Sequence, residues 1–129
     1  MPYRNLSTVP VYKKALSLCH TSRELASYFS YNKDLLQLYK SSSLRDIMAN
    51  SILTDAILLP IQIEQAERSD CKHTKLHSIK FINTITRNIL SYCNGLEHHG
   101  VKEKEYLNLL RTEITSFRKT YKNWRRSLR

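Results

Sequence analysis

Residues 106–128 read YLNLLRTEITSFRKTYKNWRRSL, and this stretch decides the fold that we predict for the chain. Its apolar positions recur in a near-heptad series at Tyr106, Leu109, Leu110, Ile114, Phe117, Tyr121, Trp124 and Leu128. This spacing puts the apolar side chains on one side of a helix, and that side must pack against other helices. The stretch therefore predicts a long amphipathic helix at about 102–127.

Basic residues recur on a different side of the same helix. Residues 114–129 contain six Lys or Arg and no Asp or Glu. Positions i, i+4, i+7 and i+11 are taken by Arg118, Lys122, Arg125 and Arg129. One side of the helix can dock while the other displays positive charge, which is typical of a protein that binds a polyanion. Nucleic acid is the first candidate.

Three more helices are predicted upstream, at about 10–30, 44–67 and 75–98. Each has apolar residues at helical spacing, and the chain has only two glycines and three prolines, too few for the turns of a β-rich fold. Pro10 suits a first helical turn, Ser43 suits an N-cap and Gly100 suits a helix end. The polar connection between the first two helices has room for one or two helical turns at 34–39.

The predicted helices are of similar length, and short loops join most of them. This pattern favours a single domain over 1–129 that folds as an all-α, up-down antiparallel four-helix bundle. Pro60 lies inside the helix at 44–67, where a proline removes one backbone hydrogen bond and clashes with the preceding turn. We therefore expect a kink or a local break there. Residues 68–74 are polar and are expected to form a loop.

The net charge of +10 is spread unevenly along the chain. Residues 44–70 hold two basic and five acidic side chains, whereas residues 101–129 hold nine basic and three acidic ones. Lys and Arg can contact phosphates by displacing condensed counterions, although a solvated basic surface is the alternative. The predicted nucleic-acid-binding residues are Arg118, Lys119, Lys122, Arg125, Arg126 and Arg129, with Arg111, Lys13 and Lys14 if the helices at 10–30 and 102–127 adjoin.

Aromatic side chains lie beside these basic residues. Tyr121 and Trp124 could stack on unpaired bases or pack into the core. Their helical spacing favours the core.

Three cysteines, Cys19, Cys71 and Cys93, do not form a disulfide framework, and Cys19 and Cys93 fall in apolar stripes. The first ten residues lack the apolar segment of a signal peptide, and the longest apolar run, 56–61, is far shorter than a membrane span. We expect a cytoplasmic protein with no membrane partner.

Catalytic patterns are weak in this sequence. Arg68 and His73 have the Arg-x4-His spacing of some all-helical ribonucleases of the HEPN class, which leaves acid–base cleavage of RNA as an alternative. Cys71, His73 and His77 could begin a metal site, but a fourth ligand is not evident. Two glycines cannot build a phosphate-cradling loop. We predict a protein that is not an enzyme and uses no cofactor or metal.

With four helices, a proline inside the second and a cationic last helix, the chain resembles a family of four-helix-bundle proteins. The family comprises proteins encoded in 23S rRNA intervening sequences and the accessory variability determinant (Avd-like) proteins of diversity-generating retroelements. Its second helix tends to carry Pro-x-x-Ile-Ala-Glu-Gly/Ala, and Pro60, Ile63 and Ala66 fall at matching offsets. Gln65 takes the place of the family acid, and Glu64 precedes it.

The resemblance implies a ring-shaped homo-oligomer, as in the homopentameric barrel of Avd-like proteins. It also implies that the chain has no catalytic residues, binds RNA or DNA and a reverse transcriptase, and supports mutagenic cDNA synthesis. Two alternatives stay open: a helical-bundle protein encoded in an rRNA intervening sequence, and a protein-interaction module of unknown role.

Overall fold

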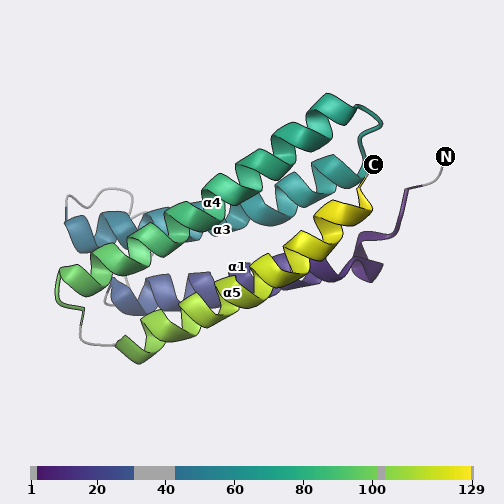
Figure 1. Cartoon of the computed structure of the whole chain (residues 1–129). Helices are drawn as coiled ribbons and strands as arrows, with labels where there is room; N and C mark the ends of the chain where they lie inside the picture. Colours follow the sequence, from purple (N-terminus) through teal and green to yellow (C-terminus); the bar gives the residue numbers. More distant parts are fainter. Residues whose placement is uncertain (1–2, 31–42, 102–103, 129) are drawn as a thin grey trace.

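In the part of the chain that it describes, the computed structural model contains four long helices packed as a bundle (Figure 1). The structure describes residues 3–30, 43–101 and 104–128. Its helices are α1 (Pro10–Phe29), α3 (Leu44–Glu67), α4 (Lys72–His98) and α5 (Lys104–Ser127), and a short 3-10 helix, η1 (Leu6–Thr8), precedes them. The all-α prediction is therefore confirmed over these residues. The turns expected at 34–39 and the basic residue Arg129 lie outside them.

Each helix packs against two neighbours, which is consistent with an up-down bundle. α3 lies between α1 and α4, and α5 lies between the same two helices on the other side. α3 and α5 are therefore across the bundle from one another. Figure 1 shows the α3–α4 pair stacked on the α1–α5 pair. This arrangement places the exposed side of α5 away from the exposed side of α3.

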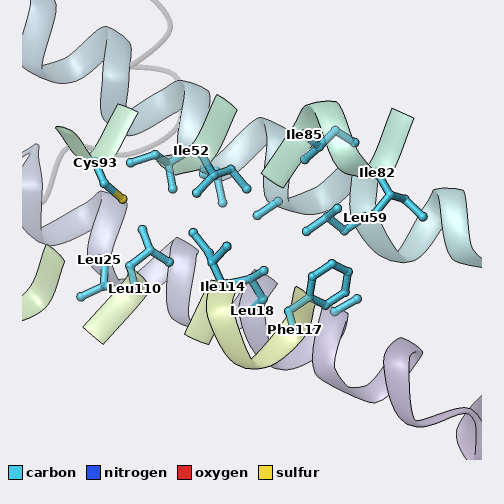
Figure 2. Close-up of a cluster of buried hydrophobic side chains, with 14 of the residues drawn as sticks. Leu18, Leu25, Ile52, Leu59, Ile82, Ile85, Cys93, Leu110, Ile114 and Phe117 are labelled. Carbon is cyan, nitrogen blue, oxygen red and sulfur yellow. The ribbon is translucent and has the colours of Figure 1, made fainter. Parts of the chain in front are cut away.

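The core runs along the bundle axis and draws apolar side chains from all four helices. Figure 2 shows them converging from the two helix pairs. Those labelled there are Leu18, Leu25, Ile52, Leu59, Ile82, Ile85, Cys93, Leu110, Ile114 and Phe117, all of them buried. Burying a Leu, Ile or Phe side chain stabilises the fold by about 1.5–3 kcal/mol, so this core dominates the stability of the bundle.

Local sequence signals mark three of the helix ends. α1 begins at Pro10, and Ser43 takes the N-cap position of α3 with an extended backbone. Gly100 ends α4 with φ of +80°, in the left-handed region that favours glycine. The N–H of Gly100 bonds to the carbonyl of Glu97, and the N–H of Val101 bonds to that of Leu96, which together form a Schellman motif.

The start predicted for one helix was wrong, and the local break considered at Pro60 is not found. α4 begins at Lys72 rather than near residue 75, because Cys71 takes the N-cap position and the polar residues after it are already helical. Pro60 does not break α3, which is continuous from Leu44 to Glu67. The carbonyl of Ala56, which would have bonded to the missing N–H of Pro60, accepts a hydrogen bond from the Cys19 thiol instead.

The helix α3 is apolar on both its inner and outer sides. Of the helices in the described residues, it alone is long and apolar enough to cross a membrane by length and composition. Its inner side carries buried core residues such as Ile52, Leu59 and Ile63. Its outer side exposes a set of residues that carries no charge: Leu44, Ile47, Thr54, Ile57, Ile61 and Gln65. We call this set the outer face of α3.

Candidate nucleic-acid interface

Helix α5 is fixed in the bundle by its apolar side. Phe117, Tyr121 and Trp124 are buried. The hydroxyl of Tyr121 donates to the main-chain carbonyl of Ile79 in α4 at 2.8 Å. Because the same side chains both fill the core and bond to neighbouring elements, the rotation of α5 about its own axis is set.

A buried carboxylate completes this anchoring at one end of the bundle. The indole N–H of Trp124 donates to Oε2 of Glu67, the last residue of α3, at 2.7 Å. Arg4 donates to the same carboxylate, with its Nε 3.0 Å from Oε1. Burial alone would raise the pKa of Glu67, but the hydrogen bonds from Arg4 and Trp124 hold it below its usual value. The N-terminal segment, α3 and α5 are thereby joined through one charge.

A different side of α5 displays the positive charge that the sequence pattern predicts. Lys119, Lys122, Arg125 and Arg126 are exposed, and Arg118 is half-buried. The guanidinium carbon of Arg125 lies 5.8 Å from the centre of the Tyr121 ring, a cation–π contact that orients the side chain. These five residues are called the basic face below.

Two open grooves lie along the exposed side of α5 and share two of their lining residues, Thr115 and Lys119. The first has a volume of about 580 Å³ and is lined by Asn108, Arg111, Thr112, Thr115, Ser116 and Lys119. The second, of about 470 Å³, is lined by Leu90, Thr115, Arg118, Lys119 and Lys122. Apart from Leu90, the lining residues that the structure describes offer an amide, hydroxyls and cations and include no carboxylate, a chemistry suited to phosphate oxygens.

Arg111 is less available than its position in the sequence suggests. Its guanidinium donates to Glu97 at 2.7 Å, to Asn94 at 2.8 Å and to Asn108 at 3.0 Å. Hydrogen bonding from Arg111 also lowers the pKa of Glu97. Arg111 therefore ties α5 to the end of α4 and lines the first groove with part of its charge neutralised.

Lys13 and Lys14 were predicted to extend the basic surface if their helix adjoins the last one, and α1 and α5 are indeed neighbours. Lys14 donates from Nζ to the hydroxyl of Ser116 on α5 at 3.0 Å, and both lysines are exposed. Lys14 therefore lies at the edge of the first groove.

Sequence reasoning missed the neutral lining residues. Asn108, Thr112, Thr115 and Ser116 carry no charge, and Leu90 belongs to another helix. The only signal for the first four was their spacing along the exposed side of α5. Nothing in the sequence shows that Leu90 faces Arg118, because α4 and α5 meet through tertiary packing.

The residues of the alternative predictions lie at the α3–α4 connection. Arg68 forms an ion pair with Glu64 at 3.3 Å, and the side chains of both are about half exposed. His73 is exposed on the first turn of α4. Within the described part of the chain, no group of three His, Cys, Asp or Glu side chains could hold a metal ion.

The candidate interface thus consists of two adjoining grooves lined by cations on a helix that the core holds in place. Comparison with known protein families, with curated proteins and with solved structures found no match for this chain.

Proposed function

We propose that this protein is a non-enzymatic accessory protein that binds nucleic acid through the basic face of α5. The observation that carries the proposal is the division of α5 into two sides. Phe117, Tyr121 and Trp124 are buried, while Lys122 and Arg125, each one residue further along the helix, are exposed. Because the bundle already holds the helix that carries these cations, its backbone need not be ordered on binding, which reduces the entropic cost.

Binding of this kind is electrostatic and depends steeply on salt. Each Lys or Arg that contacts a phosphate releases condensed counterions, so the logarithm of the binding constant falls by about 0.9 per contact for each tenfold rise in salt. Five contacts correspond to a loss of about two to three orders of magnitude between about 50 and 200 mM salt.

Self-association of the chain is part of the proposal, and the outer face of α3 is the surface for it. Ile47 is 45% exposed and Ile61 is 43% exposed, in a protein with a net charge of +10. The one acidic residue between Asp46 and Glu64 is Asp55, and burial raises its pKa. Because α3 lies across the bundle from α5, copies joined there would keep their basic faces free.

The resemblance to Avd-like proteins supplies the biological setting that we propose. The oligomer would be a ring such as a homopentamer, and it would present nucleic acid to a reverse transcriptase during mutagenic cDNA synthesis in a diversity-generating retroelement. A reverse-transcriptase gene with a template repeat beside this gene would support that setting. A position inside an rRNA gene would favour the intervening-sequence alternative.

Charge reversal on two faces of the same bundle tests the nucleic-acid proposal. The test variant carries both Arg118→Glu and Lys122→Glu. The control variant carries both Arg23→Glu and Lys72→Glu, so it has the same net charge but is altered on α1 and at the start of α4. Fluorescence anisotropy with a labelled oligonucleotide should show a loss of about tenfold or more for the first variant only. An equal loss in both variants, or binding that does not weaken with salt, would contradict a specific role for α5.

A further inference from the structure

We infer that the basic face is built for double-helical nucleic acid and contacts its sugar–phosphate backbone, rather than for an unpaired strand. This inference rests on the proposed function and specifies its ligand. Three observations support it: the chemistry of the grooves, the burial of the nearby aromatic rings, and the density of positive charge along α5.

Among the described residues, the lining of the grooves consists mainly of hydrogen-bond donors and cations rather than of aromatic rings on which bases could stack. Within residues 3–30, 43–101 and 104–128, Leu90 is the one apolar residue that lines them, and no aromatic ring of this part of the chain does so. Proteins that bind single strands gain about 1–3 kcal/mol per base from stacking on aromatic side chains. A single strand on this surface would forgo that term, whereas a duplex keeps its bases stacked on each other.

The aromatic rings of α5 that lie nearest the cations are already occupied by the protein. Tyr121 is 2% exposed and Trp124 is 5% exposed. The hydroxyl of Tyr121 and the indole N–H of Trp124 both bond to protein acceptors, so turning either ring outward would break its hydrogen bond to Ile79 or to Glu67. Such a movement would also open the core, which makes it energetically unfavourable.

The exposed aromatic residues of the described chain lie elsewhere. Tyr28, at the end of α1, contacts the ring of Tyr106 with a centroid separation of 4.6 Å. Phe81 stacks with His77 on α4, and Tyr3 donates to Asp70 beside the α3–α4 connection. None of these rings lines the two grooves.

The five cations of the basic face outnumber the phosphate charges that a single strand presents over the same length, whereas a duplex presents enough charges for all five. The five cations of the basic face lie within residues 118–126, about 12 Å along the helix axis. A duplex presents about seven phosphate charges over that length, and one of its strands presents about half as many. α5 also has no Gly or Pro that would let it bend around a flexible strand.

The test compares duplexes with their own strands. The full chain is titrated into a DNA duplex and an RNA duplex, each of about 20 base pairs, and binding is measured by fluorescence anisotropy at low salt. The separate strands of each duplex, chosen without self-complementarity, are titrated in the same way. Each duplex should bind at least about tenfold more tightly than its strands, and a strand in which several bases are replaced by abasic sites should bind as well as the intact strand. Strands that bind as tightly as duplexes, or abasic strands that bind more weakly, would overturn the inference.

The variants separate this inference from the function on which it rests. Failure of every probe to bind, or binding unaffected in the Arg118→Glu, Lys122→Glu variant, contradicts nucleic-acid binding by α5 altogether. If the chain binds single strands more tightly than duplexes, and this variant abolishes that binding, the proposed function stands. Only the inference that the ligand is a duplex is then contradicted. Tyr28→Ala and Phe81→Ala provide a further check: both should bind strand and duplex like the wild type, and a selective loss of strand binding would show that an exposed ring stacks on bases.

Discussion

The thiol of Cys19 donates a hydrogen bond to the main-chain carbonyl of Ala56, with its sulfur 2.9 Å from the oxygen. Ala56 lies four residues before Pro60, and a proline has no N–H to complete the helical bond to that carbonyl. Burial raises the pKa of the Cys19 thiol to about 11, so it keeps its proton at neutral pH and can donate. α1 therefore supplies the donor that α3 lacks.

A double-mutant cycle tests this relationship. Cys19→Ala should lower the free energy of unfolding by about 1–3 kcal/mol, because it removes a donor and leaves a half-buried carbonyl without a partner. In a Pro60→Ala background the restored N–H can bond to Ala56, so the same Cys19→Ala change should cost less. Urea denaturation of the wild type, the two single variants and the double variant gives the coupling free energy between Cys19 and Pro60. An identical cost in both backgrounds would show that Cys19 acts only by packing.

The carboxylate of Glu67 should make the stability of the bundle sensitive to acid. Its pKa is lowered in the folded protein, so the folded state favours the charged form and the unfolded state binds protons first as the pH falls. The stabilisation is therefore present above the usual Glu pKa of about 4.3 and is lost as the pH falls through the lower folded value.

Thermal unfolding at neutral pH and at about pH 3 measures this effect. Glu67→Gln should lower stability at neutral pH, because the amide cannot carry the charge that Arg4 meets, and should reduce the loss of stability on acidification. Trp124→Phe should cost about 1.5–3 kcal/mol at neutral pH, since it removes a hydrogen bond to a charged group. A Glu67→Gln protein with the same acid sensitivity as the wild type would place the titrating group elsewhere.

The outer face of α3 should control the oligomeric state. Ile47→Lys combined with Ile61→Lys puts two charges on the proposed interface without altering the core. The molar mass measured by light scattering should therefore fall from that of an oligomer to that of a monomer. The control, Leu16→Lys with Leu109→Lys, alters two equally exposed apolar residues on α1 and α5 (47% each) and should leave the mass unchanged. A wild-type protein that is monomeric at all concentrations would contradict self-association.

The ion pair between Arg111 and Glu97 should weaken nucleic-acid binding. Glu97→Gln removes the negative charge beside the first groove and frees the guanidinium, so binding should tighten a few-fold at low salt. Glu24→Gln on α1 removes the same charge from a residue that pairs with His20, and it serves as the control. If both variants tighten binding equally, the effect comes from net charge and not from Arg111.

Much of the fold could be predicted from local patterns. The spacing of Phe117, Tyr121 and Trp124 predicted which side of α5 is buried, and Pro10 and Gly100 correctly predicted where helices begin and end. The start of α4 was missed because Lys72, His73 and Thr74 add no apolar residue to the periodic pattern, although they are helical.

The basic row of α5 was likewise visible in the sequence, but its surroundings were not. The sequence by itself determined that α5 has an apolar and a cationic side, because both follow from the 3.6-residue period of a helix. The tertiary structure decided that Arg111 is held by Glu97 and that Leu90 completes a groove with Arg118. It also decided that Cys19 makes Pro60 tolerable inside α3 and that Trp124 is held by the carboxylate of Glu67. These contacts join residues far apart in the chain, so they depend on how the helices pack and not on the period of any one of them.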